Sequence, residues 1–455
     1  MTAPLQLVIP PEFDLAYQQM WSAYQGDTDV WRRVTIALRD AQVDHAIRRC
    51  PYYARTIPRG ARFEDIPILT KPLIREHFDD LVAKDAPEHR KLSMRTAGTS
   101  GEPLSFLRDT AGTLVDAMAS DRFFRALHNV PFTATIIAVN AVSRGGEPYS
   151  RWSRISGRVR AAVAGEPARD PWLLTLPLID VGPGDVQRYL DRWNRLRGYF
   201  FVGQSSGIDW LAQQIEEQGL RLQRPPVAIA ATSDTLTEHA RLRMERVFGA
   251  PVHARYGSNE FPFLAGSQPG RVDRFLFNPL LAYVELLDDE DRPVPPGELG
   301  RVVLTNLNER VMPLIRYQQG DLAVASPEGY VGGFRVVEGL IGREAELLRF
   351  PSGRAVGGSA LGQLLVKRHD FAPWVRNFQC VQTGPNELEL RVAWARDPGD
   401  ARTRIAAAVR EAADPDTVVR VRDIDEPDRY PSGKVWVVRG LQEPAGDATP
   451  ASPSA

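Results

Sequence analysis

A strand–helix–strand pattern at residues 226–256 constrains the fold of this chain more than any other feature. PVAIAAT (226–232) is short, apolar and bounded by turns, which predicts a buried strand. A helical stretch follows and ends at Gly249, and PVHARY (251–256) then predicts a second strand. Two strands joined through a helix are usually parallel neighbours in one sheet, so we expect an α/β fold with a parallel sheet.

The helix between these strands carries its own signals. Thr235 and Glu238 fit a capping box with the threonine at the N-cap. Four apolar residues then fall on one helical face: Ala240, Met244, Val247 and Phe248. Parallel sheets bind ligands at the carboxyl ends of their strands, and YGSNE (256–260) stands at such an end.

The rest of the chain divides into regions that differ in their pattern of apolar and turn-forming residues. Residues 13–60 and 66–82 have helical spacing, with Thr70 as the expected N-cap of the second stretch, and 132–142 predicts another buried strand. From residue 280 the pattern becomes rich in β hairpins, and 342–440 predicts a smaller α+β unit. We expect an N-terminal domain at 1–341 (an α/β core at 60–275 and a β-rich part at 276–341), a C-terminal domain at 342–441 and a disordered tail at 442–455.

Composition excludes several functional classes. The net charge of the 455 residues is −1, so no overall field favours nucleic acid or anionic membrane. The two cysteines, Cys50 and Cys380, form neither a disulfide framework nor a zinc-ligand pattern. The first residues do not read as a signal peptide, and the longest apolar-leaning stretch is too short to span a bilayer. We expect a cytoplasmic protein with no membrane or nucleic-acid partner.

TAGTSGEPL (96–104) has the residue types of a phosphate-binding loop. Glycines let backbone N–H groups converge, and hydroxyl groups add further donors. The spacing is not that of a Walker loop, and Glu102 stands where a phosphate loop is expected to carry a lysine. Taken alone, the stretch is equally compatible with an ordinary polar turn, which is the commoner case.

Three further short motifs could serve a nucleotide. In YGSNE, Tyr256 could stack on a base and Glu260 could hold a hard cation such as Mg2+. In RYQQGDLA, Asp321 could accept hydrogen bonds from ribose hydroxyls. In YPSGKVWVV, Lys434 offers a mobile cation for phosphate charge. Each motif alone also fits a solvated loop.

The order of these motifs resembles the adenylate-forming superfamily. TAGTSGEP, SDTLTE with its helix and ARYGSNE, RYQQGD, GRE and PSGK follow one another as they do in the phenylacetate–coenzyme A ligase group, which includes coenzyme F390 synthetase and capsule-biosynthesis-like relatives. The resemblance covers about residues 60–440. It implies a large α/β N-terminal domain with a β-rich part, and a small α+β C-terminal domain that moves during the reaction.

The resemblance implies a role for each matching residue. Lys434 and Glu260 would be catalytic, with Lys434 at the α-phosphate and Glu260 on Mg2+. Asp321 would hold the ribose, with Arg343 near it. The loop around the phosphates would use Thr96, Gly98, Thr99, Ser100 and Gly101, and the adenine would lie near Ser233, Asp234, Tyr256, Gly257 and Ser258.

The implied reaction is ATP- and Mg2+-dependent activation of an aromatic or similar carboxylic acid as an acyl-adenylate, with transfer to coenzyme A. Glu102, Asn259 and Ala345 depart from the family pattern, as does FPSGRAVGGSALG (350–362). Two alternatives therefore stay open: delivery of the acyl group to an amine or a carrier-protein thiol, and a non-catalytic nucleotide-binding scaffold. The substrate pocket is expected from 132–145, 203–210 and 257–266, where Phe261 and Phe263 could pack an aromatic acid or belong to the core.

Overall fold

The computed structural model contains two compact units: the larger consists of the described residues up to 341 together with Arg429, and the smaller consists of the other described residues from 342 onward. It describes residues 29–95, 104–131, 134–140, 173–177, 183–196, 198–233, 235–343, 347–352, 355–357, 361, 365, 371, 373–414, 416–429 and 436–441. Each unit is described by itself below.

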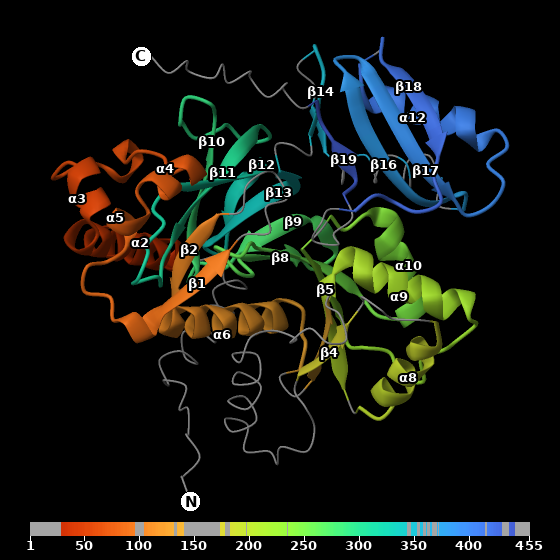
Figure 1. Ribbon diagram of the computed structural model, residues 1–455, viewed down its shortest axis with the longest axis horizontal. Coiled ribbons are helices and arrows are strands. Elements are labelled where there is room, and N and C mark those ends of the chain that lie inside the picture. The colour runs from red at the N-terminus through yellow and green to blue at the C-terminus, as the bar shows by residue number, and fades with distance from the viewer. Residues whose placement is uncertain are drawn as a thin grey trace, which may run out of the picture. The chain divides into compact units, whose positions relative to one another are not determined.

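A mixed sheet forms the centre of the larger unit (Figure 1). Five neighbouring strands are parallel: β7 (Val252–Tyr256), β6 (Ile229–Thr232), β5 (Tyr199–Gln204), β3 (Thr135–Asn140) and β4 (Leu173–Pro177). Beyond β7, in sheet order, lie β8 (Ala265–Gln268), β9 (Arg271–Phe277), β13 (Phe334–Arg343), β12 (Tyr317–Val331), β11 (Leu299–Asn306) and β10 (Ala282–Leu287). The predicted α/β class, with a parallel sheet joined to a β-rich part, is confirmed.

Alternation along the parallel strands explains how the sheet is covered. Phe201 and Ile229 pack with the apolar faces of α9 (Ser205–Glu217) and α10 (Glu238–Phe248). Their neighbours Phe200, Ala228 and Ala230 instead pack with Phe124 of α6 (Thr110–Leu127). Because successive side chains point to opposite faces, these strands are buried on both sides, as parallel strands usually are. Another helix of this region is α8 (Pro183–Trp193).

The N-cap of the crossover helix α10 lies two residues later than the capping-box prediction. Thr237, not Thr235, is the N-cap, and its hydroxyl accepts a hydrogen bond of 3.2 Å from the backbone N–H of Ala240. The cap and its donor are three positions apart, as in ordinary N-capping, so the predicted N-cap at Thr235 is wrong by two residues. Gly249 ends the helix with φ of 66°, as predicted from the αL preference of glycine.

Short helices before the sheet pack near the antiparallel strands. They are α2 (Val30–Arg49), α3 (Pro51–Thr56), α4 (Lys71–Glu76), α5 (Phe78–Leu81) and the 3-10 turns η1 (Phe63–Asp65) and η2 (Glu88–Arg90). Val34, Val43 and Ile47 of α2 contact the main core, which confirms the helical periodicity of this region. Thr70 is the N-cap of α4 as predicted, although its side chain makes no capping hydrogen bond.

A hairpin brackets the expected phosphate loop. β1 (Lys91–Arg95) pairs antiparallel with β2 (Ser105–Asp109), and Arg95 lies opposite Ser105. The residues that connect these two strands, 96–103, lie outside the described residues. The described part of the fold therefore positions both ends of this segment.

The smaller unit is an α+β structure with its own core, as predicted. Its four-stranded sheet has the order β18 (Val418–Asp423), β17 (Glu387–Trp394), β16 (Val375–Gly384) and β19 (Val438–Arg439). Ile405 and Val409 of α12 (Ala401–Ala412) pack in that core, and β14 (Leu347–Arg349) and β15 (Ala355–Gly357) form a short hairpin. Across all the described ranges, no helix is long and apolar enough to cross a membrane.

Candidate functional site

The carboxyl ends of β6 and β7 carry two of the predicted site residues. Ser233 follows β6 directly and has φ of 74°, in the left-handed region that residues other than glycine seldom adopt. Tyr256 is the last residue of β7. Strained backbone of this kind is concentrated at functional sites, so the conformation of Ser233 supports a site at this edge of the sheet.

Gly257 allows the loop after β7 to fold back on itself. A Cβ at this position would lie 2.3 Å from the backbone nitrogen of Phe263 and 2.9 Å from the carbonyl oxygen of Phe261. Ser258 closes the turn, because its N–H donates to the Phe261 carbonyl at 2.9 Å and its hydroxyl accepts from the Phe261 N–H at 3.1 Å. The sequence YGSNE therefore builds a tight turn that fixes the direction of Glu260.

Glu260 is a buried carboxylate, with 6% of the residue exposed. The Tyr317 hydroxyl donates a hydrogen bond of 3.0 Å to Glu260 Oε1. The Tyr317 ring in turn stacks on Phe261, with ring centroids 6.2 Å apart and an interplanar angle of 6°. Phe261 is thus part of the core, while Arg255 lies 3.9 Å from the ring centroid of Phe263.

The surroundings of Glu260 fit a Mg2+ ion only if a nucleotide shares it. Mg2+ is usually held by one or two protein carboxylates, while waters and phosphate oxygens complete its shell. The part of the chain that the structure describes contains no group of three or more His, Cys, Asp or Glu side chains suited to hold a metal alone. Among the described residues the donor to Glu260 is the neutral Tyr317, so a cation would favourably compensate the buried charge.

Asp321 lies beside Tyr256, as the proposed nucleotide site requires. The Tyr256 hydroxyl donates to Asp321 Oδ2 at 2.7 Å, and the side-chain amide of Gln319 donates to the same oxygen at 2.7 Å. The Gln319 amide also donates to the Tyr256 hydroxyl. Burial, followed by the nearby Asp321 charge, raises the pKa of Tyr256 well above its usual value, which keeps the phenol protonated as a donor.

A bulge in β12 presents Gln319 and Asp321 together. Arg301 pairs with Leu322 and Val303 with Gln318, so three residues of β12 stand opposite Val302 alone. Gly320, in the middle of the bulge, has φ of 100°, a value that glycine adopts readily. Bulges commonly redirect side chains at functional sites, and this one brings the RYQQGD motif to the end of β7.

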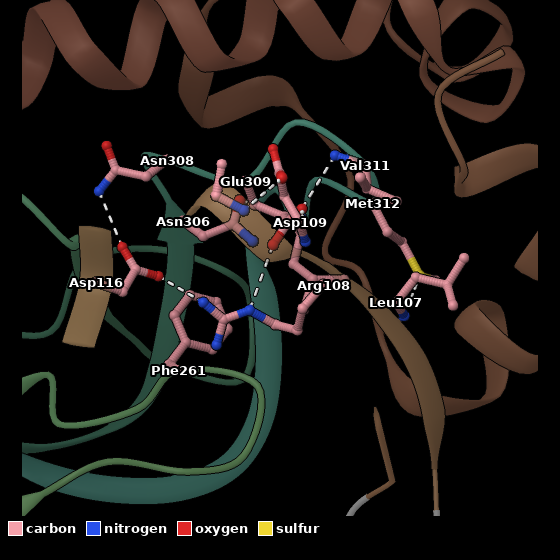
Figure 2. A network of polar contacts seen from close by, with 12 residues as sticks. Leu107, Arg108, Asp109, Asp116, Phe261, Asn306, Asn308, Glu309, Val311 and Met312 are labelled. Carbon is pink, nitrogen blue, oxygen red and sulfur yellow. Dashed lines mark hydrogen bonds and ion pairs between the residues drawn. The ribbon is translucent and has the colours of Figure 1, made fainter. Parts of the chain in front are cut away.

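A second, buried polar network was not predicted from the sequence (Figure 2). Three of its residues line the same cavity as Glu260. Arg108 donates to Asp116 at 2.6 Å and to Glu309 at 3.3 Å, and Asn308 donates to Asp116 at 3.1 Å. Glu309 Oε1 accepts from the backbone N–H groups of Asp109 and Val311, at 2.8 Å and 3.0 Å. Burial raises the pKa of Glu309 to about 7, while the Arg108 charge opposes the shift.

This network fixes the base of the hairpin that flanks residues 96–103. Asp109 ends β2, caps α6 by accepting from the Ala111 N–H at 3.0 Å, and pairs with Arg90 at 2.9 Å. A Cβ on Gly112 would lie 2.7 Å from the Asn308 carbonyl oxygen. Helix α6 therefore approaches the segment that follows β11 very closely. The Glu309 bonds therefore connect the hairpin, α6 and the segment before β12.

A cavity of about 10 Å3 joins this network to the candidate metal ligand. Arg108, Asp116 and Glu309 line it together with Glu260. A space of this size holds about one water molecule. Glu260 is thus next to a buried polar cluster and not isolated in an apolar core.

The structure brings some predicted residues together and does not describe others. Tyr256, Gly257, Ser258, Glu260 and Asp321 share one region through Tyr317 and Gln319. For Arg343, the structure describes only the backbone, at the end of β13. The remaining predictions lie outside the described residues: Thr96, Gly98, Thr99, Ser100, Gly101, Asp234 and Lys434. Ala345 and Glu102 also lie outside them.

Comparisons with known proteins support the fold and extend the sequence resemblance. No protein-family model matches the chain. The protein CapK of Staphylococcus aureus is 22% identical over 296 residues, which are 64% of this chain and 60% of CapK. The match thus covers less than two thirds of that relative.

Several solved ligases have the same fold. A 2-hydroxyisobutyryl-CoA ligase, solved in the postadenylation state with an acyl-AMP, superposes with a TM-score of 0.68 at 19% identity, over 90% of this chain and 89% of that chain. An anthranilate CoA ligase with anthranoyl-AMP gives 0.55 at 15% identity, over 80% and 69% of the two chains. The o-succinylbenzoate CoA synthetase of Bacillus subtilis gives 0.51 at 14%, over 76% and 67%. The chain therefore has the fold of the adenylate-forming CoA ligases.

Proposed function

We propose that this protein is an AMP-forming ligase, which activates a carboxylic acid with ATP as an acyl-adenylate and releases pyrophosphate. One observation carries the proposal. Tyr256, at the carboxyl end of β7, holds the Asp321 carboxylate, and it stands four positions before the buried Glu260. The fold is shared with CoA ligases that were solved with acyl-adenylates, which supports this assignment of the site.

The nucleoside half of ATP would bind at the end of β7. Asp321 accepts from the ribose, and its orientation is fixed by the hydrogen bonds from Tyr256 and Gln319. The Tyr256 ring, packed edge-on against Phe277 with centroids 5.9 Å apart, is held ready to stack on the adenine. Such fixed positioning reduces the entropy that is lost when the reacting groups meet.

The phosphates would lie between the loop at 96–101 and Glu260. In the proposal, backbone amides and hydroxyls of the loop donate to the phosphate oxygens, and the β1–β2 hairpin holds both ends of the loop. Mg2+, when bound, neutralises phosphate charge and polarises the α-phosphate. Glu260 holds the metal, and Lys434 stabilises the oxygens around the α-phosphorus.

The chemical step is an in-line displacement at that phosphorus. An oxygen of the substrate carboxylate forms a bond to the α-phosphorus, and the bond from this phosphorus to the pyrophosphate oxygen breaks. The products are the mixed anhydride acyl-AMP and pyrophosphate, and no proton transfer is required. The protein contributes positioning and charge stabilisation, which account for most of the catalysis in reactions of this kind.

We further propose an aromatic or similar acid as the substrate and coenzyme A as the acceptor. We assign the contact with such an acid to Phe263, a partly buried residue of the loop after β7 whose ring packs against Arg255, whereas Phe261 belongs to the core. The three solved proteins of the same fold reported above are CoA ligases or a CoA synthetase, which supports coenzyme A as the acceptor. The departure at 350–362 favours a second candidate acceptor, an amine or a carrier-protein thiol.

The products identify both the activation step and the acceptor. The protein is incubated with ATP, Mg2+ and a panel of aromatic, amino and short aliphatic acids, and the mixtures are analysed by mass spectrometry. We expect acyl-AMP with one class of acid, and its conversion to an acyl-CoA thioester when coenzyme A is added. Acyl-AMP that persists with coenzyme A but reacts with an amine or a carrier protein would support the second acceptor.

A further inference from the structure

One buried glutamine of the smaller unit binds the backbone at two points that are separate along the chain. Gln379, in β16, has 0% of its surface exposed. Its Oε1 accepts from the backbone N–H of Asp428 at 2.8 Å, and its Nε2 donates to the Asp428 carbonyl at 2.9 Å. The same Nε2 donates to the carbonyl of Trp436 at 2.8 Å. Because one nitrogen donates to both carbonyls, the chain returns at Trp436 to the place that it left at Asp428.

The three bonds fix the direction of the Gln379 amide. A side-chain amide supplies two N–H donors, and here each of them ends on a backbone carbonyl. Rotating the amide by 180° would set Oε1 against two carbonyl oxygens and Nε2 against an N–H, so all three bonds would be lost. Gln379 therefore holds its two partners in one arrangement and has no N–H left for another role.

The bonds to Asp428 determine the path of the chain more than they satisfy buried polar groups. Asp428 is exposed, so water could satisfy its backbone without help from the core. It also lies beyond β18, which ends at Asp423, so the pairing of that strand does not hold it. Its carboxylate pairs with Arg391 at 2.6 Å, but exposed ion pairs are weak. Gln379 is thus the main reason for the position of the Asp428 backbone.

Trp436 is anchored at the other end. The residue is 2% exposed, and the guanidinium of Arg439 lies 4.2 Å from the centroid of its ring. The chain then enters the sheet, because the N–H of Cys380 in β16 donates to the Val437 carbonyl at 2.7 Å and β19 follows parallel to β16. The sheet itself therefore fixes the point to which Gln379 ties Asp428.

The segment 429–435 lies between these two fixed points and carries Lys434. We infer that Gln379 is a positioning residue for adenylate formation: it holds both ends of this segment and thereby the place from which Lys434 acts. Residues 430–435 are outside the described residues, so the inference concerns only the ends of the segment. It rests on the proposed function and deepens it. Fixing the ends lowers the entropy that is lost when the cation meets the reacting phosphate.

Limited proteolysis of the full-length protein tests the hold on the segment separately from catalysis. Trypsin cleaves after arginine and lysine, so Arg429 and Lys434 are its sites in the segment, and mass spectrometry identifies both products. Gln379→Met keeps the length of the side chain but loses all three hydrogen bonds. Cleavage at the two sites should become roughly 10-fold faster, the scale of losing hydrogen bonds that keep a local region closed. Unchanged cleavage in the folded variant would overturn the inference.

Steady-state kinetics test whether this hold serves Lys434. In pyrophosphate exchange with an acid that the wild type accepts, Gln379→Met should lower kcat roughly 10-fold or more and keep KM for ATP within about 2-fold. The reason is that Lys434 is proposed to stabilise charge at the α-phosphate during the reaction and not to bind the nucleotide. An unchanged kcat in the folded variant, or a raised KM with kcat retained, would contradict the role of Gln379.

A second variant covers poor folding of the first. Gln379→Asn keeps an amide but is one methylene shorter, so it reaches only one end of the segment. It should show the same loss of kcat and the same faster cleavage. Wild-type values for both in folded Gln379→Asn would refute the inference.

The chain offers a matched control in Gln382, three positions later in β16. This buried side chain also makes three backbone bonds: its Oε1 accepts from the Arg349 N–H at 3.0 Å, and its Nε2 donates to the carbonyls of Arg349 and Pro385 at 2.6 Å and 3.1 Å. Gln382→Met should lower the thermal midpoint about as much as Gln379→Met but leave kcat and cleavage in the segment at wild-type values. If it changed both as Gln379→Met does, the effect would be a general loss of stability, and the inference would fail.

The two kinds of failure can be told apart. Wild-type protein without exchange for any acid would contradict the proposed function, and the trypsin result would still decide whether Gln379 holds the segment. Wild-type exchange together with an unchanged kcat in folded Gln379→Met would overturn the inference alone.

Discussion

At the scale of single residues, Glu260 is where charge and burial conflict most directly. The carboxylate is 6% exposed and its hydrogen-bond donor, Tyr317, is neutral. Arg108 lines the same small cavity but makes its printed bonds to Asp116 and Glu309. A bound cation would further compensate the buried charge of Glu260, which is the physical argument behind the proposed metal site.

Glu260→Gln should therefore separate the two roles. The amide keeps an acceptor for the Tyr317 hydroxyl but loses the charge that binds Mg2+. We expect Mg2+-dependent pyrophosphate exchange to fall roughly 100-fold, the scale of losing one electrostatic stabiliser, while the thermal midpoint changes little or rises. The exposed Glu298, changed to glutamine in the same way, should behave as wild type. Full exchange activity in Glu260→Gln would contradict the metal assignment.

At the scale of elements, the crossover helix α10 shows how sequence reasoning can be right about a helix and wrong about its first residue. Two threonines, Thr235 and Thr237, precede the helix, and both are good N-caps by type. Which of the two threonines becomes the N-cap depends on the path of the chain after β6 and Ser233. Tertiary structure determines that path, so the local sequence does not reveal it.

The cap can be checked by a pair of substitutions. Thr237→Ala removes the acceptor for the Ala240 N–H and should lower the free energy of unfolding by about 1 kcal/mol. Thr235→Ala should change the free energy of unfolding by less than half of that amount, because the N-cap bond stays intact. Urea denaturation of the two variants measures the difference. A larger loss in Thr235→Ala would restore the capping box.

The hairpin network supplies the second prediction at this scale. Glu309→Ala removes one of the two carboxylates that accept from Arg108 and leaves two buried backbone N–H groups without their acceptor, so we expect a loss of about 3–5 kcal/mol in the free energy of unfolding. The exposed ion pair of Arg62 with Asp65 is the comparison, and Asp65→Ala should cost less than about 1 kcal/mol. Urea denaturation measures both. Similar small losses would show that the Glu309 network does not hold the hairpin.

The sequence could predict this site only in part, because some of the residues that meet in the site are far apart along the chain. YGSNE, RYQQGD and the strand ends are local patterns, and the structure places Tyr256, Glu260 and Asp321 in one region. Glu309 and Arg108 are 201 positions apart, and no local pattern pairs them. The sequence did contain one signal: Glu309 stands just before the apolar stretch VMPLI (311–315). An ionic residue in such a place indicates a buried charge with a distant partner.

At the scale of the whole molecule, buried neutral histidines make stability depend on pH. His128, at the end of α6, stacks on His253 of β7 with ring centroids 3.7 Å apart. Burial lowers the pKa of His128 to about 2 and that of His253 to about 4. The unfolded chain takes up protons near pH 6.5 and the folded chain does not, so stability present above pH 6.5 is lost as the pH falls toward 4.

Urea denaturation between pH 7.5 and pH 5 checks this expectation. Each histidine should contribute a loss of about 1.4 kcal/mol for every pH unit below 6.5. His128→Leu removes one of the two groups and should roughly halve the contribution of this pair. A stability profile that is identical in the variant and the wild type would show that the rings are protonated in the folded protein.

The α/β fold class with its β-rich part could be anticipated from the residue pattern, because hairpin-rich and helical stretches differ in their periodicity. The internal arrangement of the large sheet could not, since strands β9 and β13 pair across about 60 residues of chain. Glu102, Asn259 and Ala345 leave one competing account of the molecule, a scaffold that binds a nucleotide without reacting.

Acid-dependent exchange of labelled pyrophosphate into ATP tests the central claim most directly, because it requires nucleotide binding, Mg2+ and reversible acyl-adenylate formation but no acceptor. The protein is assayed with the panel of aromatic, amino and short aliphatic acids, and each signal is compared with a sample without acid. We predict exchange above that background with at least one class of acid, and its loss in Glu260→Gln. ATP binding without exchange for any acid would contradict the account and leave the scaffold in its place.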